Sequence, residues 1–191
     1  MKKIVLIIIS IFSILYLSAN DKIKVGIQAP VFTISEQETS TSALKNNKYL
    51  VLIFYRGNWC PICMKHISEL NDSIQLITDK YASVVIVTPE APESIIETKE
   101  KTKVNKLNII YDKDYKIMKA FDVDYKITKK SVPKFYSFVK KFTRNANKNN
   151  DDILPIPATF IINQENKIIY QQVDKNYKNR ASVAQIIEQL K

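Results

Sequence analysis

The feature that most constrains the fold is a pair of cysteines placed between two segments of different periodicity. Cys60 and Cys63 are the only cysteines in the chain. A continuous apolar run from 49 to 54 precedes them, and such a run predicts a strand. After them, apolar residues recur with helical spacing at positions 67, 70, 74 and 77. The pattern predicts a strand, a tight turn and a helix that begins at the Cys-x-x-Cys motif.

The residues around this motif favour an ionised thiol. A helix N-terminus carries about half a positive charge, which stabilises a thiolate and lowers its pKa. Arg56 lies four residues before Cys60, and Pro61 suits the first turn of a helix. Trp59 either covers one side of the site or packs in the core. Together these residues indicate thiol–disulfide chemistry at the start of the helix.

Two purely structural uses of the motif fit the chain less well. A disulfide between Cys60 and Cys63 closes a loop too short to stabilise the fold much. A structural zinc site wants four ligands, and the chain offers one histidine, His66, besides the two thiols. We therefore expect a redox-active disulfide, no metal and no cofactor. His66 shares a helix face with Cys63 and could tune the thiolate, but we favour a half-exposed helix histidine.

The first twenty residues have the pattern of a signal peptide. Lys2 and Lys3 precede an apolar run from 4 to 17, and small and polar residues follow it. The run is shorter than the roughly 20 residues of a membrane span. We expect a signal peptide over residues 1–20 and one domain over 21–191, with an uncleaved anchor formed by residues 4–17 as the alternative. Both interpretations imply export, to the periplasm or another extracytoplasmic compartment.

The formal net charge of +10 says little about partners. Lysine, asparagine and isoleucine are abundant throughout, whereas glycine occurs twice. The densest basic segment, 140–144, runs into a polar low-complexity stretch, 145–152, that is typical of a solvated loop. Export removes most nucleic acids as partners. We therefore expect no nucleic-acid binding, and membrane contact only through an uncleaved N-terminal segment.

The order of the predicted elements indicates an α/β fold. A turn that leads into a short strand is expected over 24–34. Further strands are expected at 49–55, 83–88, 107–111, 158–162 and 167–172, and the last two form a hairpin. Helices are expected at 42–46, from the cysteines to about 79, and at 93–104, 115–121 and 182–190. A further helix around 135–142 lies in an insertion at 129–152. Strands that alternate with helices imply a sandwich of helices around a mixed central sheet.

A second group of residues precedes the predicted strand at 158–162. Pro157 comes directly before this strand, and a proline there cannot donate a hydrogen bond to a sheet ladder. In the cis form, which is a minority state, it would present the backbone of Ile156 outward as a pairing edge for a substrate chain.

Four segments, in this order, resemble the AhpC/TSA peroxiredoxin-like branch of the thioredoxin superfamily. They are 25–32 (VGIQAPVF), 54–63 (FYRGNWCPIC), 154–160 (LPIPATF) and 173–181 (VDKNYKNRA). The resemblance covers essentially everything after about residue 22 and implies a thioredoxin-like sandwich. It also implies that Pro157 takes the position of the cis-proline beside the active site.

The resemblance assigns the two thiols in two ways. In the pattern of typical peroxiredoxins, Cys63 is the peroxidatic cysteine. Arg56 and Cys60 then stand where the family has proline and threonine or serine, and the distant arginine falls on Arg180. In the pattern of thioredoxin-like exchange proteins, Cys60 attacks and Cys63 resolves. Both patterns end in a Cys60–Cys63 disulfide that an external, thioredoxin-like thiol donor reduces.

The resemblance therefore implies an enzyme whose substrate is a peroxide or a protein disulfide. We favour a thiol-dependent antioxidant enzyme, with Arg56 and Arg180 stabilising the thiolate and the developing negative charge. The alternatives are a protein disulfide reductase or oxidant with Cys60 as nucleophile, and a redox-inactive binding module whose basic surface meets an anionic partner.

Overall fold

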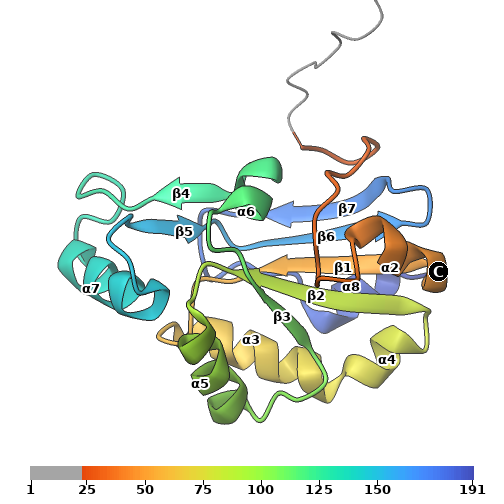
Figure 1. The fold of residues 1–191 in the computed structure, drawn as a ribbon, viewed down its shortest axis with the longest axis horizontal. Helices are drawn as coiled ribbons and strands as arrows, with labels where there is room; N and C mark the ends of the chain where they lie inside the picture. The colour runs from red at the N-terminus through yellow and green to blue at the C-terminus, as the bar shows by residue number, and fades with distance from the viewer. Residues whose placement is uncertain (1–22) are drawn as a thin grey trace, which may run out of the picture.

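The computed structural model describes residues 23–191, which form an α/β fold with a five-stranded sheet in the order β3-β2-β1-β6-β7 (Figure 1). The expected signal peptide over residues 1–20 lies outside the described residues. The strands are β1 (Tyr49–Phe54), β2 (Ala82–Thr88), β3 (Asn108–Tyr111), β4 (Asp124–Lys126), β5 (Ile153–Pro155), β6 (Ala158–Asn163) and β7 (Ile168–Val173). The helices are α2 (Ser40–Asn46), α3 (Pro61–Asp72), α4 (Ile74–Thr78), α5 (Pro92–Thr102), α6 (Lys116–Ala120), α7 (Tyr136–Asn147) and α8 (Val183–Gln189).

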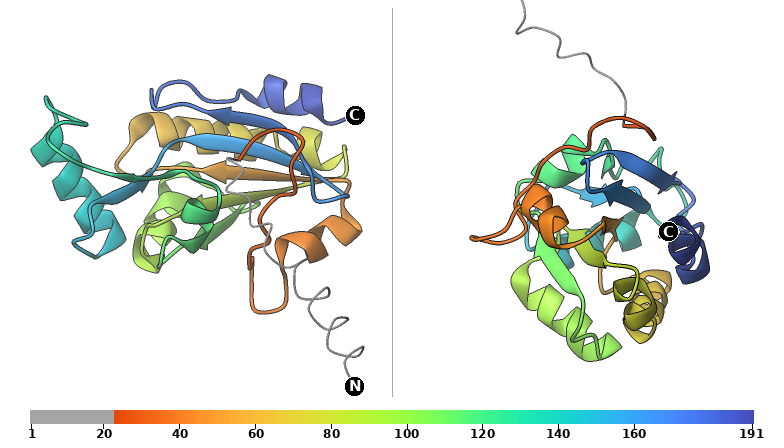
Figure 2. Two further views of the ribbon diagram at one scale, coloured as in Figure 1. Left: turned by 90° about the horizontal axis from the view of Figure 1, so that it is seen from above. Right: turned by 90° about the vertical axis from the view of Figure 1, so that its right-hand side faces the viewer.

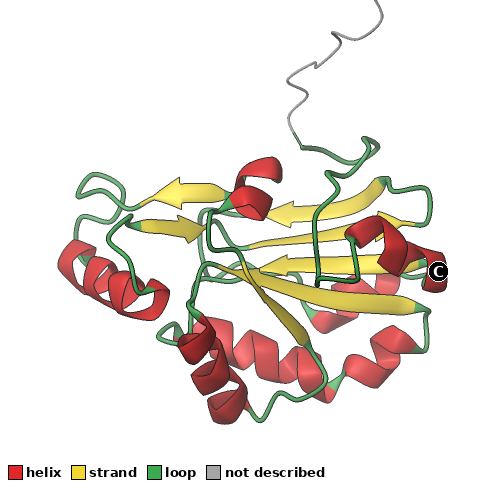
Figure 3. Ribbon diagram, in the orientation of Figure 1, coloured by secondary structure: helices red, strands yellow, loops and turns green. Residues whose placement is uncertain are grey.

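The sheet is mixed, which confirms the fold class expected from the sequence. β1 runs parallel to β2, and β2 runs parallel to β3. β6 runs antiparallel to both β1 and β7, so the expected C-terminal hairpin forms one edge of the sheet. Figure 3 shows the five strands of this sheet as one twisted layer with helices on both sides, and the short strands β4 and β5 beyond it.

The uninterrupted apolar run of β1 follows from its central place in this sheet. Val51 and Ile53 point to one face, where they pack in a core with residues of α3, α4, α5 and α8. Leu50 and Leu52 point to the other face, which α2, α6 and the N-terminal segment cover (Figure 2). A strand covered on both faces needs apolar residues at every position rather than at alternate ones.

The helix after the cysteines is interrupted, contrary to the single helix to about residue 79 that the sequence predicts. Ser73, with φ −103° and ψ 7°, separates α3 from α4. Its N–H donates to the carbonyls of Glu69 and Asn71, which closes the end of α3. Ile74 and Ile77 are buried beyond the break. The apolar spacing therefore continues across Ser73 and hides the interruption.

Three further expectations differ from the structure. Residues 24–34 form no ladder strand and contribute only two isolated bridges, from Gln28 to Lys167 and from Thr33 to Thr39, although Phe32 and Ile34 are buried. The two-stranded sheet of β4 and β5 was not expected, because three-residue strands show no periodicity. The helix expected around 135–142 is α7, and it extends to Asn147, into the stretch that the sequence predicts as a loop.

Within residues 23–191, no helix combines the length and the apolar composition that a bilayer span requires.

Candidate active site

The two cysteines lie where the chain leaves the sheet and enters α3, at the carboxyl ends of the parallel strands β1 and β2. The N–H of Cys60 donates to the carbonyl of Gly57 at 3.0 Å, which closes the turn. The carbonyl of Cys60 accepts the first helical hydrogen bond, from Met64 N–H, also at 3.0 Å. Cys60 is therefore the N-cap of α3 and Pro61 its first residue, so both free thiols belong to the first turn.

The local contacts make Cys60 the acidic thiol of the pair. Its pKa is lowered to about 6, mainly because the Cys63 thiol donates a hydrogen bond to the Cys60 thiolate. The backbone N–H of Cys63 and the positive charges of Arg56 and Arg180 act in the same direction, whereas burial opposes them. A large fraction of Cys60 is therefore thiolate at neutral pH.

Cys63 has the opposite character. It is completely buried, and burial raises its pKa well above the ordinary value, as does its hydrogen bond to Cys60. Arg180 Nη2 donates to Cys63 Sγ at 3.1 Å, and its charge opposes the increase. The result is a chain of hydrogen bonds from Arg180 through Cys63 to Cys60. Each donor in such a chain polarises the next, which strengthens the bond to the thiolate.

Arg56 is held over the site between two aromatic rings. Its guanidinium carbon lies 4.9 Å from the centre of the Trp59 ring and 4.7 Å from the centre of the Tyr177 ring. Cation–π contacts of this kind hold a guanidinium group in one position. The sequence left two roles open for Trp59, covering the site or packing in the core. In the structure it is partly buried and packs against the core, and its ring also contacts Arg56. Tyr177 lies in the segment 173–181, but the sequence gave no sign of this contact.

His66 is buried, so the expectation of a half-exposed histidine is wrong. It is 5% exposed, and its Nε2–H donates to the carbonyl of Ala181 at 2.9 Å. Burial and the nearby charge of Arg180 lower the pKa of His66, which keeps the ring neutral. The hydrogen bond ties α3 to the residue after Arg180. His66 thereby helps to hold Arg180 at the thiol pair.

A buried carboxyl group lies beneath the active loop and was missed by the sequence. Glu90 is 0% exposed, and its Oε1 accepts the N–H of Asn58 at 2.6 Å. Its Oε2 accepts hydrogen bonds from the hydroxyl groups of Tyr55 and Thr98. Burial raises the pKa of Glu90 to about 7, although these hydrogen bonds oppose the change. Its place just after β2, beside the carboxyl end of β1, is the one signal that could have identified it.

Gly57 cannot carry a side chain in this loop. Its φ of +149° is one that other residues rarely adopt. A Cβ atom there would lie 2.6 Å from Trp59 Nε1 and 3.0 Å from Glu90 Oε1. The glycine therefore permits the indole and the buried carboxyl group to close over the loop from two sides.

The segment before β6 differs from the expectation based on the resemblance. Within residues 23–191 every peptide bond is trans, so Pro157 is not a cis-proline. The N–H of Ile156 donates to the carbonyl of Val123 at 2.7 Å, and the carbonyl of Pro157 accepts the N–H of Asp174. Ile156 therefore does not offer its N–H as a pairing edge, because the chain leading into β4 already occupies it.

A cavity of about 400 Å³ adjoins the site. Arg56, Tyr177 and Pro157 are among the residues that line it. Apolar residues from β4, β5 and α7, among them Leu154 and Val139, line the remainder. An apolar cavity with a few polar groups is the usual form of a small-molecule site.

The structure thus brings together Cys60, Cys63, Arg56 and Arg180, and it places Trp59, Pro61 and Pro157 around them. In the part of the chain that the structure describes, no three His, Cys, Asp or Glu side chains lie close enough to hold a metal ion. The chemistry available at the site is that of an ionised thiol beside a protonated one, under two positive charges.

Comparisons with known proteins agree with this geometry. Residues 25–171 match the AhpC/TSA family. Peroxiredoxin Bcp of Bacillus subtilis is 26% identical over 171 residues, which cover 88% of this chain and 96% of that protein. Thiol-disulfide oxidoreductase ResA of Bacillus cereus is 22% identical over 157 residues, covering 82% and 73%.

The fold is also similar to solved structures. Peroxidoxin BcpB of Mycobacterium tuberculosis superposes with a TM-score of 0.67 at 16% identity, over 88% of this chain and 96% of that one. Mycobacterium tuberculosis AhpC superposes with a TM-score of 0.63 at 14% identity, over 88% and 92%. The thioredoxin-like sandwich that the resemblance implies is therefore confirmed.

Proposed function

The chain belongs to the AhpC/TSA family and is a thiol-dependent oxidoreductase, and we propose that it is a peroxidase in which Cys60 attacks and Cys63 resolves. The observation that carries this assignment is the contrast between the two thiols: Cys60 is the N-cap of α3, and its pKa is lowered to about 6, whereas burial raises the pKa of Cys63 well above its ordinary value. Cys60 is therefore the thiol that ionises first, while Cys63 stays protonated. This order reverses the one that the peroxiredoxin pattern implies for the two positions.

The proposed cycle has three balanced steps. The Cys60 thiolate attacks the terminal oxygen of a hydroperoxide, and the O–O bond breaks to give Cys60 sulfenic acid and an alcohol or water, whose oxygen takes up a proton. The Cys63 sulfur then displaces the sulfenic hydroxyl as water and forms the Cys60–Cys63 disulfide. An external dithiol, a thioredoxin-like donor, reduces the disulfide and leaves with its own sulfurs oxidised.

The two arginines serve different atoms in this proposal. The charge of Arg56 acts on Cys60. The Arg56 side chain is held between Trp59 and Tyr177 and lines the cavity through which a peroxide would approach. Arg180 donates directly to Cys63 Sγ. Positive charge fixed before the reaction stabilises negative charge as it develops, without a cost of reorganisation.

A protein disulfide is the second candidate substrate, and a specific observation supports it: a Cys-x-x-Cys pair at a helix N-terminus with the first thiol acidic, together with the similarity to ResA. The bond from Ile156 N–H to Val123 argues against it, because a docked chain would lack that donor. We therefore favour a peroxide as the oxidant.

Single cysteine variants test both parts of the proposal. With the reduced protein and a single equivalent of hydrogen peroxide, Cys63→Ser should consume the peroxide and stop at the sulfenic acid, whereas Cys60→Ser should consume almost none. A burst that survives in Cys60→Ser and disappears in Cys63→Ser would reverse the attack order. Faster reduction of a peptide disulfide than of hydrogen peroxide would favour the second candidate. Unchanged redox activity in both variants would support the binding module.

We further propose that residues 1–20 direct export, to the periplasm or another extracytoplasmic compartment. The basic residues and the apolar run at 4–17 support this, and retention of that run would anchor the domain to the membrane. The redox domain then comprises residues 21–191, with the insertion at 129–152 between β4 and β5.

A further inference from the structure

The insertion that carries α7 combines exposed aromatic rings with a concentration of positive charge. Phe135 is 65% exposed and Phe138 is 53% exposed. The rings of Phe138 and Phe142 lie 4.3 Å apart between their centres. Phe135, Phe138 and Phe142 follow helical spacing, so they share one face. The adjoining side of the helix packs inward through Val139, Ala146 and other buried residues, and Phe142, between the two sides, is partly buried beside Trp59. The exposed rings of Phe135 and Phe138 are therefore not part of the core of the domain.

The charge of this region is unusually high for its length. Residues 129–152 contain seven lysines and arginines against two aspartates, a net charge of +5 in a chain whose total is +10. Lys140 and Arg144 both pair with Asp152. Lys129, Lys130, Lys134, Lys141 and Lys148 are exposed. Half of the net charge thus lies in one insertion, which a uniform bias in composition does not explain.

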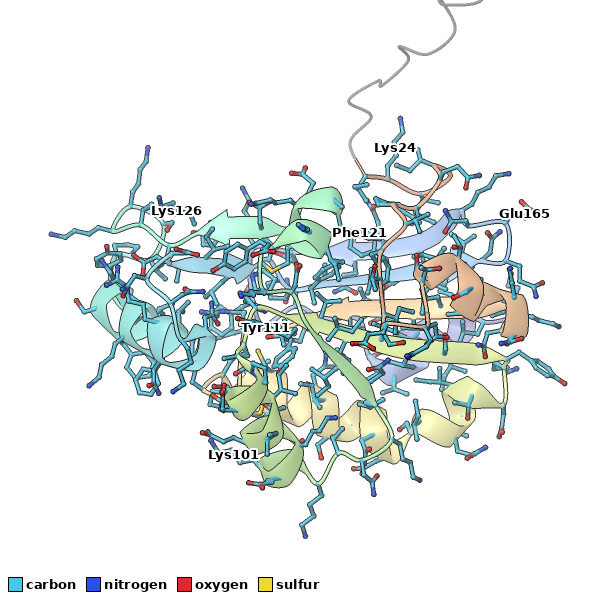
Figure 4. All side chains as sticks on the ribbon, in the orientation of Figure 1. Lys24, Lys101, Tyr111, Phe121, Lys126 and Glu165 are labelled. Carbon is cyan, nitrogen blue, oxygen red and sulfur yellow. The ribbon has the colours of Figure 1, made fainter. Side chains whose placement is uncertain are left out.

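The lysines and the rings lie together at one end of the molecule. Figure 1 shows α7 at the end beyond β4 and β5, and Figure 4 places Lys126 at that same end. Lys141 follows Phe138 by three residues and so lies on its side of the helix. Lys141, Arg144 and Lys148 also line an open hollow of about 470 Å³. The hollow offers several cations to one anionic group.

We propose that the surface formed by Lys134, Phe135, Phe138, Lys141 and Phe142, the α7 surface, docks on an anionic phospholipid membrane. Helices that lie in a membrane interface combine aromatic residues on one face with lysines beside them. The lysines complement the negative charge of the lipid surface, and the rings enter the boundary between headgroups and acyl chains. An acidic protein would satisfy the charges, but three neighbouring rings would also require a matching apolar pocket.

Docking in this orientation would bring the redox site close to the lipid surface. Phe142 lies 6.4 Å from Trp59 between ring centres, and Val139 of α7 lines the cavity beside Arg56. The inference does not depend on the thiol chemistry, since it rests on the composition and exposure of α7 alone.

The first test measures where the full-length chain contacts vesicles. A tryptophan is introduced by Phe138→Trp, and its quenching by brominated phosphatidylglycerol is compared with that of Ile96→Trp. Ile96 is a matched control because it is 56% exposed on α5, outside the α7 surface. We expect quenching of the indole at 138 above the wild-type signal of Trp59 and no added quenching at 96. Equal quenching at the two positions would overturn the proposal.

The second test separates the α7 surface from the apolar N-terminal run, which every variant retains. Phe135→Ser with Phe138→Ser, or Lys134→Gln with Lys141→Gln, should each weaken partitioning into phosphatidylglycerol vesicles on the order of tenfold. The control pair Lys99→Gln with Lys106→Gln changes the same charge outside the surface and should leave it unchanged. Wild-type partitioning in the α7 variants, or equal binding to phosphatidylcholine vesicles, would refute docking. Docking on lipid would also be refuted if the α7 variants bind vesicles normally but are reduced more slowly by the protein dithiol donor. That result would indicate that the surface binds a protein partner.

Discussion

Replacing Cys63 should raise the pKa of Cys60. In Cys63→Ala the Cys60 thiolate loses its main stabilising contact, the hydrogen bond from the Cys63 thiol, and keeps the backbone N–H at 63 and the charges of Arg56 and Arg180. A hydrogen bond to a charged group contributes roughly 1.5–3 kcal/mol. One pKa unit corresponds to about 1.4 kcal/mol, so the pKa should rise by roughly one to two units. The expected value is then roughly 7–8, instead of about 6.

The pH dependence of alkylation measures this change directly. The thiolate is the reactive form, so the rate with iodoacetamide follows the ionised fraction of Cys60. At pH 7 that fraction should fall from roughly nine-tenths to between one-half and one-tenth. Cys63→Ser is the matched control, because its hydroxyl group can still donate and should hold the midpoint closer to that of the wild type. A midpoint that stays near 6 in Cys63→Ala would refute the argument, because the helix N-terminus and the arginines would then be enough to lower the pKa of Cys60.

Three other changes test the residues that support the site. Gly57→Ala forces a Cβ atom to 2.6 Å from Trp59 Nε1 and should lower the unfolding free energy by about 2 kcal/mol or more. Gly26→Ala is the control, because Gly26 also has a positive φ but its Cβ atom would meet nothing within 4 Å; it should lower the unfolding free energy by about 1 kcal/mol. Urea unfolding measures both changes. In the folded protein the pKa of Glu90 is raised from 4.5 to about 7, so its contribution to stability is present at low pH and is lost as pH rises through 7. The unfolding free energy of Glu90→Gln should therefore rise by up to about 3 kcal/mol relative to that of the wild type between pH 4.5 and 8. An identical pH dependence of unfolding in the two proteins would contradict this. His66→Phe leaves the carbonyl of Ala181 without its donor and should destabilise the fold by about 1–3 kcal/mol while raising the alkylation midpoint of Cys60, a second effect that simple loss of packing would not produce.

The sequence predicted the parts of the site that lie on one continuous segment. The apolar run of β1, the turn and the apolar spacing of α3 are local patterns, and together they placed Cys60, Cys63, Arg56 and Pro61 correctly on the fold. Arg180 lies 117 positions from Cys63, and only the resemblance to a family connected the two. No periodicity could have joined them.

The contacts that the sequence did not predict depend on how strands pair. Glu90 reaches Asn58 only because β2 lies beside β1 in parallel register, which brings the ends of both strands together. The bond from Ile156 to Val123 depends on the short sheet of β4 and β5, whose strands have three residues each. A buried carboxyl group and an occupied N–H are properties of that tertiary arrangement rather than of any local pattern.

The hydrogen-bond chain from Arg180 through Cys63 to Cys60 implies that the two arginines act at different stages. While Cys60 is a thiolate, its charge and its hydrogen bond keep the proton on Cys63. Oxidation of Cys60 to the sulfenic acid removes that negative charge. Burial still raises the pKa of Cys63, but the guanidinium 3.1 Å away now has no competing anion, so it favours loss of the proton that resolution requires.

Arg180 should therefore matter more for resolution than for attack. In Arg180→Met the attack on hydrogen peroxide should slow modestly, because Cys60 keeps its bond from the Cys63 thiol, whereas disulfide formation should slow by at least about tenfold, the effect of roughly 1.4 kcal/mol. The sulfenic acid should then accumulate and be trapped by dimedone, as mass spectrometry can measure. Arg56→Met is the matched control and should slow attack without accumulation of the sulfenic acid. If the sulfenic acid accumulates in Arg56→Met but not in Arg180→Met, then Arg56 rather than Arg180 governs disulfide formation.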